Sequence, residues 1–317
     1  MLRFAIIGDL HVGGVAEEVQ TTIELVNARE LDFVLFLGDL TNKPTDENIA
    51  EFVRQVRRIE HPVYLTIGNH DTARCLEGFD FEKALAGQLP GPWSDGFTYE
   101  FHAGGWKFIV CSLADMQMDY KGPQINRIKG MVSENGGMIH VPPPHLVRFG
   151  ELLEASGQTP TVVVMHVPLV RMAARTAARG CYAQVRLLEE WQITSMVEQR
   201  PNVKMCLYGH DHFNQAEVVN DRLHLITQGV RGMWQYEDTS AIRLMEIDDS
   251  IPARRGSPPS RSTVRSRLIW SGRDGEAPGE LGTSLGDIAF EWTVPDRPFV
   301  YPRVQGWGAN RITWEEK

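Results

Sequence analysis

Short, mostly apolar segments recur along the chain, and each is followed by a glycine or a histidine. These segments cover residues 4–7, 33–37, 63–67, 161–165 and 204–208. Runs of this length, rich in β-branched and aromatic side chains, are typical of parallel strands that are buried on both faces. The pattern therefore predicts a set of buried strands, and it places the polar residues that come next at their carboxyl ends.

Apolar positions at helical spacing lie between these segments. They predict helices over residues 17–29, 46–60 and 81–89. Strand and helix therefore alternate in the first part of the chain, as in an α/β protein. Residues 97–101 and 106–110 then flank Gly104-Gly105, which predicts an antiparallel hairpin.

Residue types that bind metal ions come directly after all of the predicted strands. They are Asp9, His11, Asp39, Asn69, His166, His210 and His212. Loops at the carboxyl ends of strands in an open α/β sheet meet at one crevice, so we expect these side chains to converge. A lone His or Asp after a strand is more often a loop residue or a helix cap, but the joint occurrence favours a metal site.

The chemistry of this set indicates which ions it holds. Imidazoles, carboxylates and one amide oxygen suit Mn, Fe or Zn better than Mg or Ca, and no cysteine joins them as in a structural zinc site. The ligands are also too many for one ion. Two ions roughly 3.5–4 Å apart, bridged by a carboxylate, favour displacement at phosphorus. Asp39 is the natural bridge, and we expect two divalent or trivalent ions.

The motifs resemble those of a known family. The blocks Asp9-Leu10-His11, Gly38-Asp39, Gly68-Asn69-His70-Asp71, His166 and Gly209-His210-Asp211-His212 are similar, in order, to the pattern of the calcineurin-like metallophosphoesterases. The resemblance covers about residues 1–248. It implies an α/β fold, a four-layer αββα sandwich of two mixed β-sheets flanked by helices, to which we add a C-terminal β-rich appendage.

The resemblance also implies a role for each motif residue. One metal is held by Asp9, His11 and His212, the other by Asn69, His166 and His210, and Asp39 is shared between them. His70 stands beside the leaving-group oxygen as the proton donor, or as a positive charge, and Asp71 orients it. Alternatively, Asp71 caps a helix that starts near Thr72. Asp211 is expected to be a turn residue; alternatively, it accepts a hydrogen bond from a metal-bound imidazole.

Three further residues are weaker candidates for contact with a phosphate group. Asn42, Arg74 and Asn214 lie within a few residues of the predicted ligands. The alternative is that they are solvated loop residues.

Within the family, the chain is most similar to the cyclic nucleotide phosphodiesterase-like (class III) branch. Residues 38–42 and 68–71 carry that similarity, whereas Met165-His166-Val167-Pro168 departs from the branch's His-His-Pro-Pro string. The resemblance implies a phosphodiesterase in which a metal-bridging hydroxide attacks phosphorus. The alternatives are a phosphomonoesterase or nucleotide pyrophosphatase on the same site, and a non-catalytic binding module.

Composition narrows the choice of substrate. The 317 residues carry a net charge of −9, and no long basic block precedes residue 250, so a long nucleic acid is not expected. A small phosphodiester or nucleotide-like substrate fits better. We find neither a leader nor an apolar run long enough to span a membrane, and the four cysteines have no paired spacing, so we expect a cytoplasmic protein.

The chain divides into three predicted parts. Residues 1–248 form the catalytic domain, in which residues 115–144 are either a lid or a loop for dimer contacts. Residues 249–267, rich in Arg, Ser and Pro, are expected to be a flexible connector rather than a nucleic-acid arm. Residues 268–317 form an appendage with four tryptophans, which packs against the core or against a second subunit of a homo-oligomer. The alternative is that this appendage covers the substrate.

Overall fold

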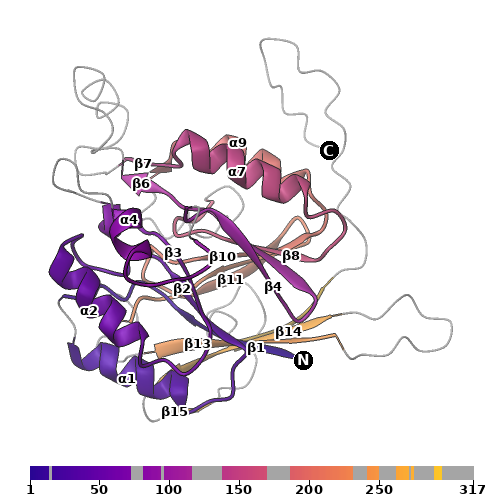
Figure 1. Ribbon diagram of the computed structural model, residues 1–317. Coiled ribbons are helices and arrows are strands. Elements are labelled where there is room, and N and C mark those ends of the chain that lie inside the picture. Colours follow the sequence, from indigo (N-terminus) through magenta and orange to yellow (C-terminus); the bar gives the residue numbers. More distant parts are fainter. Residues whose placement is uncertain are drawn as a thin grey trace.

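The computed structural model describes most of the predicted catalytic domain and part of the C-terminal region beyond it. The described residues are 1–13, 16–72, 81–93, 96–115, 138–169, 186–230, 241–249, 262–270, 273–274 and 289–294. Two β-sheets pack face to face, with α1 and α2 outside one and α7 and α9 outside the other (Figure 1). The predicted four-layer αββα sandwich is therefore confirmed.

The first sheet contains the amino-terminal strands. Strands β1 (Leu2–Ile7), β2 (Phe33–Leu37) and β3 (Val63–Thr66) are parallel. On the other side of β1, the antiparallel strands β13 (Ala241–Asp248) and β14 (Thr263–Trp270) extend the sheet, and β14 pairs with both β15 (Arg273–Asp274) and β16 (Ala289–Thr293). β1 therefore lies between two sheet neighbours, and its carboxyl end is deep in the molecule.

Helices form in the three places that the sequence predicted. They are α1 (Ala16–Asn27) and α2 (Asp46–Val56), which cover the first sheet, and α4 (Phe81–Ala86), which contacts α2. In α2, the side chain of Thr45 accepts a hydrogen bond from the backbone N of Asn48 at 3.3 Å, which caps the helix. Ile49, Phe52 and Val56 repeat at helical spacing and are buried against the sheet.

The second sheet contains the remaining strands that lead to the predicted ligands. Its order is β11 (Gln215–Val219), β12 (Arg222–Ile226), β10 (Val203–Tyr208), β8 (Thr161–Val164), β5 (Trp106–Val110) and β4 (Tyr99–Ala103). The four strands β12, β10, β8 and β5 are parallel. Helices α7 (Pro143–Glu154) and α9 (Glu190–Glu198) cover its outer face. A small sheet of β6 (Ala114–Asp115), β7 (Met138–His140) and β9 (Arg186–Leu187) lies beside it.

The predicted hairpin is confirmed as β4 and β5. Its turn is formed by Gly104 and Gly105, at φ values of 54° and 81°. These left-handed conformations favour glycine, and a Cβ on Gly104 would also lie 2.8 Å from the Cβ of Leu2. The turn therefore sets the register of the hairpin and its approach to the first sheet.

An aromatic cluster joins the two sheets. Phe4 stacks on Phe33 in the first sheet at a centroid distance of 4.7 Å, and Phe101 stacks on Phe108 in the second at 4.7 Å. Phe33 meets Phe108 edge to face at 5.2 Å. Such pairs contribute about 0.5–1.5 kcal/mol each beyond the area that they bury. The two sheets are thus fixed relative to each other by their core.

The boundary of the predicted connector was wrong. Residues 263–267 belong to β14, which pairs with β13 along its whole length. Val264, Ser266 and Leu268 face inward and are buried, whereas the arginines at 265 and 267 point to the other face. The arginines hid an alternation of period two, which is the signature of a strand. Residues 250–261 lie outside the described residues.

The described part of the predicted appendage belongs to the first sheet. Trp292 lies in β16, is 9% exposed and joins the main core cluster. Residues 307 and 314 lie outside the described part, as do residues 116–137 of the predicted lid or dimer loop. The ends of that loop are regular, because Asp115 lies in β6 and α7 begins at Pro143.

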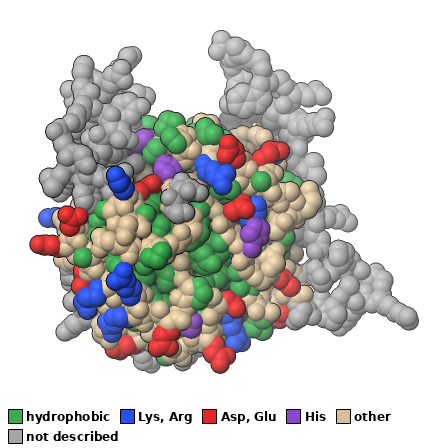
Figure 2. Space-filling model, in the orientation of Figure 1, with side chains coloured by type: hydrophobic (Ala, Val, Ile, Leu, Met, Phe, Trp, Pro, Cys, Tyr) green, Lys and Arg blue, Asp and Glu red, His purple; other side chains and the backbone are tan. Residues whose placement is uncertain are grey.

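Two of the cysteines, Cys111 and Cys206, are buried free thiols, as expected, while residues 75 and 181 are not described. Among the described residues, no helix is long and apolar enough to cross a membrane. On the face shown in Figure 2, basic and acidic side chains lie in small, separate groups rather than in one broad basic patch.

Candidate metal centre

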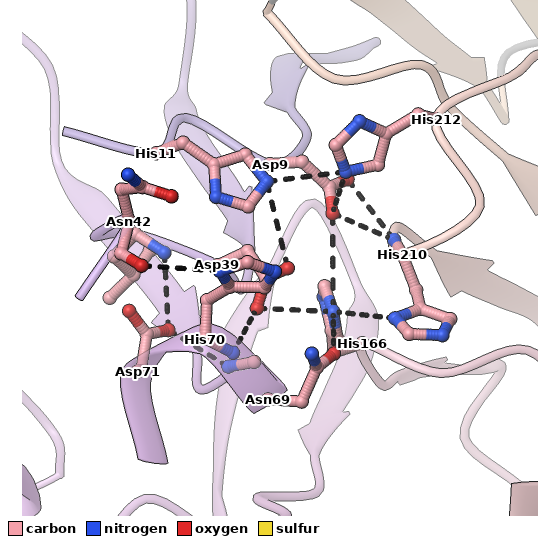
Figure 3. A network of polar contacts seen from close by, with 12 residues as sticks. Asp9, His11, Asp39, Asn42, Asn69, His70, Asp71, His166, His210 and His212 are labelled. Atoms are coloured by element: carbon pink, nitrogen blue, oxygen red, sulfur yellow. Dashed lines mark hydrogen bonds and ion pairs between the residues drawn. The ribbon is translucent and has the colours of Figure 1, made fainter. Parts of the chain in front are cut away.

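The predicted ligands converge at the carboxyl ends of strands from both sheets. Asp9, His11, Asp39 and Asn69 come after β1, β2 and β3, whereas His166, His210 and His212 come after β8 and β10. Figure 3 shows these side chains pointing toward one another, with Asp39 between two sets of neighbours. The convergence that the sequence predicted is therefore present.

The first set contains Asp9, His11, Asp39 and His212. One ligand atom from each lies within 4.8 Å of the others. The Nε2 atoms of His11 and His212 are 3.2 Å apart, and the Nε2 of His212 is 3.3 Å from Oδ1 of Asp9. Two imidazole nitrogens and two carboxylates thus face one small volume, which is a ligand set suited to one transition-metal ion.

The second set contains Asp39, His166 and His210, again within 4.8 Å of one another. The Nε2 of His166 lies 3.3 Å from Nδ1 of His210 and 3.4 Å from Oδ1 of Asp39. The side-chain oxygen of Asn69 lies 3.1 Å from the same Nε2. Asn69 therefore completes a second cluster of two imidazoles, one carboxylate and one amide oxygen.

Asp39 belongs to both sets, and its two oxygens divide between them. Oδ2 lies 3.7 Å from Nε2 of His11, and Oδ1 lies 3.4 Å from Nε2 of His166. The backbone N of His70 donates a hydrogen bond to Oδ1 at 2.8 Å, which fixes the orientation of the carboxylate. One carboxylate with an oxygen directed to each set has the geometry of a bridging ligand.

The electrostatics of the centre favour a cation. Burial raises the pKa of the Asp39 carboxyl, but the neighbouring imidazoles, His166 above all, hold it well below its ordinary value. Burial in turn lowers the pKa of His166, yet Asp39 and Asp9 raise it to about 10. Burial and the charge of His166 lower the pKa of His210 to about 3, so that imidazole is neutral. The buried carboxylates thus attract a positive charge, and the donor set fits a metal ion.

Backbone contacts fix the direction of His166. Its Nδ1 donates to the carbonyl oxygen of Leu37 at 2.6 Å, because a carbonyl oxygen can only accept. Nε2 therefore faces the centre. A metal-binding imidazole usually makes this kind of second contact, which fixes its tautomer and ring orientation.

Most of the predicted ligands lie on strained backbone. Asp9, His11, Asp39, His210 and His212 have φ values between 42° and 68°. For a residue with a Cβ, the left-handed region costs on the order of 1 kcal/mol. A Cβ on Gly209 would lie 2.8 Å from Oδ2 of Asp9, so the turn also requires glycine for close approach. The surrounding fold holds these loops in place against that cost.

Comparison with known proteins identifies the family. Residues 2–214 match the family described as calcineurin-like phosphoesterase. The chain belongs to this family. It is also 23% identical, over 58% of its length, to a 3′,5′-cyclic-nucleotide phosphodiesterase from Nostoc sp., of which the match covers 56%. The match thus spans about half the length of that relative.

Solved structures with the same fold include proteins of different kinds. A dimetal phosphatase from Danio rerio has a TM-score of 0.60 and 14% identity, covering 92% of this chain and 98% of that one. GAP50, described as the anchor in the inner membrane complex of Plasmodium, has a TM-score of 0.52 and 12% identity, covering 93% of this chain and 90% of that one. At these identities the likeness shows the fold alone.

In this chain, Asp71 contacts the backbone of two loops that bear predicted ligands. Its buried carboxylate accepts hydrogen bonds from the backbone N of Thr41 at 2.8 Å, of Gly68 at 2.9 Å and of Leu40 at 3.1 Å. Burial and the charge of Asp39 raise its pKa to about 7. Asp71 lies inside α3 (Asn69–Thr72), so the helix-cap alternative is wrong. Its contacts tie the loop that bears Asp39 to the loop that bears Asn69.

His70 is oriented by a backbone carbonyl. Its Nδ1 lies 3.2 Å from the carbonyl oxygen of Asn42, so Nδ1 donates and Nε2 is left to face outward. The ring meets that of His11 edge to face, with centroids 4.6 Å apart. His70 is not a member of either ligand set among the described residues. It therefore stands at the edge of the centre, beside the first ligand set.

The weaker candidates have different outcomes. Asn42 is exposed beside His70 and remains a candidate for substrate contact (Figure 3). Asn214 is fully buried, and its side chain bonds with Gln228 and Arg243, so the prediction that it contacts substrate was wrong. Residue 74 lies outside the described residues.

Two more residues lie near the centre: Asp211, expected to be a turn residue, and Gly229, which no predicted motif included. Asp211 is 3% exposed, and burial, followed by the charge of Asp9, raises its pKa to about 7. Gly229 packs against the centre, since a Cβ there would lie 3.1 Å from the Cβ of Asp9 and 3.4 Å from Nδ1 of His212. A strand followed by a glycine, as at residues 222–229, is the signal that could have revealed it.

Proposed function

We propose that the chain is a phosphodiesterase that depends on two metal ions. The observation that carries this proposal is the position of Asp39, whose two oxygens are directed to two separate ligand sets. When bound, the ions act as Lewis acids that activate water and neutralise charge that develops on the phosphoryl oxygens. Asp9, His11 and His212 would hold one ion, Asn69, His166 and His210 the other, and Asp39 both.

In this proposal, His70 is the catalytic acid. Its Nδ1 donates to the carbonyl of Asn42, so Nε2 is the atom that carries a proton to the leaving oxygen. The position of the ring beside His11, and outside both ligand sets, supports a contact with substrate rather than with metal. Asp71 orients His70 indirectly. It holds the backbone of residues 40 and 41, next to the Asn42 carbonyl that contacts His70.

A diester is the preferred substrate class. The relative from Nostoc is a 3′,5′-cyclic-nucleotide phosphodiesterase, and its similarity to this chain supports a small, nucleotide-like diester. The net charge of −9 disfavours a long polyanion, because binding to a phosphate backbone depends on basic side chains. We infer Mn, Fe or Zn as the ions, since all three accept this mixture of imidazole, carboxylate and amide ligands.

The proposal is tested by metal analysis together with a substrate panel. The full chain is loaded in turn with Mn²⁺, Fe²⁺ and Zn²⁺, and its metal content is measured. Hydrolysis is then followed with cyclic nucleotides, glycerophosphodiesters, nucleoside diphosphate sugars and monoesters. We expect two ions per chain and turnover of diesters. Turnover of monoesters alone would make the chain a phosphatase, and one ion per chain would overturn the bridging role of Asp39.

A further inference from the structure

We infer that Arg243 and Asn214 are positioning residues for the metal centre. They belong to a buried polar network that joins the two sheets from which the ligands come. This inference rests on the proposed two-metal centre. It concerns residues on β13 and on the loop before β11, which are remote in sequence from the first-sheet ligands.

The centre depends on the relative position of the sheets. Four of its ligands, Asp9, His11, Asp39 and Asn69, lie beyond strands of the first sheet, and His166, His210 and His212 lie beyond strands of the second. A small shift of one sheet against the other would change the distances from Asp9 and Asp39 to the imidazoles of His166 and His212. A polar contact between the sheets close to the centre would therefore control how well the ligands meet.

Arg243 provides such a contact. It lies in β13, opposite Ile6 of β1, and is fully buried. Its Nη1 donates to Oγ of Ser266 in the first sheet at 3.0 Å, and its Nη2 donates to Oδ1 of Asn214 at 2.8 Å. Its Nε also lies 3.4 Å from Oγ1 of Thr227, just beyond the end of β12. One guanidinium thus binds both sheets, and its planar donors fix direction as well as distance.

Asn214 extends the network to both halves of the centre. It is two residues beyond His212, and its Oδ1 accepts a second hydrogen bond from the backbone N of Gln228 at 3.1 Å. Its Nδ2 donates to Oε1 of Gln228 at 2.7 Å. The next residue, Gly229, forms a bridge with Gly8, and it is also the glycine that packs against Asp9 and His212. The network therefore holds the segment that lies between these two ligands.

We expect loss of this network to lower metal affinity more than it disturbs the fold. Asp9 and His212 lie on left-handed backbone, so their turns need support from neighbouring groups. Loss of the support would let His212 move relative to Asp9, and the set of Asp9, His11, Asp39 and His212 would bind its ion less tightly. The set around His166 would be affected less, because Leu37 holds that imidazole directly.

The test compares Arg243→Met and Asn214→Ala with the wild-type chain. Each protein is stripped of metal and titrated with Co²⁺, and both binding events are followed by visible absorption and calorimetry. We expect affinity at the site formed by Asp9, His11, Asp39 and His212 to fall about tenfold or more in both variants, as for other groups that support metal ligands, and affinity at the other site to fall less. Arg243→Lys keeps one donor and should recover part of the loss.

Arg222→Met is the matched control. Arg222 is also a buried guanidinium, but it donates to the carbonyl oxygens of Glu198 and Arg200 at the end of α9 and of Asn220 in the turn between β11 and β12. We expect this variant to lose thermal stability and to keep wild-type Co²⁺ affinity. Wild-type affinity in Arg243→Met and Asn214→Ala, with stability lowered as in the control, would overturn the inference. A wild-type chain that binds no Co²⁺ would instead overturn the proposed function.

Discussion

The second sheet buries histidines in two regions that differ in their charged neighbours. At the carboxyl end of β8, burial lowers the pKa of His166, but the carboxylates of Asp39 and Asp9 raise it to about 10. In the middle of β12, burial and the positive charge of Arg222 lower the pKa of His224 to about 3. The same side chain, fully buried in both places, thus has its pKa shifted in opposite directions by its charged neighbours.

This difference in charged neighbours indicates that the two regions of the second sheet serve different purposes, one metal binding and the other stability. In the region of His224, Arg222 is the charged group among the described residues that shifts the pKa of the ring, and the hydroxyl of Tyr208 lies 3.0 Å from Nδ1 of His224. At the carboxyl ends, the fold instead brings buried carboxylates together on strained turns, which is unfavourable without a cation. We therefore expect substitutions at the carboxyl ends to change metal binding and turnover, and substitutions near β12 to change the free energy of unfolding.

The largest effect is expected from Asp39→Asn, which removes the charge shared by the two sets. An amide cannot bridge two cations as a carboxylate does, so both ions should bind weakly. Because such ions contribute several kcal/mol to the transition state, turnover should fall by about three orders of magnitude. Metal analysis and diester hydrolysis are the measurements. Glu246→Gln, a half-buried carboxylate in β13 of the same sheet, is the control and should keep both ions. Two tightly bound ions in Asp39→Asn would contradict the bridge.

The next effect is expected from His70→Ala. Loss of a positioned general acid typically slows a reaction by about 10²–10⁴-fold. His70 lies outside both ligand sets, so metal content should stay at the wild-type level. A substrate whose leaving group needs no proton, such as a nitrophenyl diester, should be affected much less. Loss of metal together with turnover would show that His70 is a ligand and that its assigned role is wrong.

These two predictions concern residues that sequence alone could identify. The ligands lie directly beyond buried strands, and the carboxyl ends of parallel strands meet at one edge, so their convergence is expected from local pattern and general topology. Arg243 could not be found in this way. Its partner Asn214 lies 29 residues away, and no spacing links the two. The strand at residues 263–270 was missed because its outward arginines resembled the composition of a linker.

The contacts of Asp71 were beyond the sequence for a related reason. Its neighbour in the chain is His70, yet its carboxylate turns inward to the backbone of Thr41, thirty residues earlier. Proximity in the sequence favoured His70 as the partner of Asp71. The close approach of two loops instead brings the backbone of Thr41 to its carboxylate. Such contacts depend on the packing of loops, which no local pattern encodes.

A smaller effect is expected when the pH is lowered around His224. Its pKa of about 3 in the folded chain is below the ordinary value of 6.5, so the unfolded chain binds a proton that the folded chain does not. The contribution of His224 to the free energy of unfolding is therefore complete above pH 6.5, and it is lost as the pH falls toward 3. Between pH 6.5 and 5, the loss should be about 2 kcal/mol.

Urea unfolding of the wild type and of His224→Gln measures this contribution. The variant lacks the titrating group, so its free energy of unfolding should depend less on pH over that interval. The difference between the two proteins should therefore narrow as the pH falls. Parallel curves for the two proteins would show that His224 is protonated in the folded state, and the contrast with His166 would disappear.

The smallest effect is expected from removing an ion pair on the surface of the first sheet. There, unlike around His166 and His224, charged side chains lie at the surface and pair with side chains of opposite charge. Arg265 in β14 pairs with Glu291 in β16, with Nε and Oε2 2.6 Å apart, and Arg3 in β1 pairs with Glu246 in β13 at 3.1 Å. The side chains of Arg265 and Glu291 are exposed, so solvent screens their charges and the pair contributes about 0.2–1 kcal/mol.

Arg265→Gln should therefore lower the free energy of unfolding by less than about 1 kcal/mol, and the loss should vanish in about 1 M salt, where screening acts within about 3 Å. Metal content and turnover should not change, because the pair lies across the strands and not at their carboxyl ends. A loss of turnover in this variant would mean that β14 transmits its position to the centre through Ser266, next to Arg265, and hence through Arg243. In that case the part of the first sheet that affects turnover would include the outward face of β14 as well as β13.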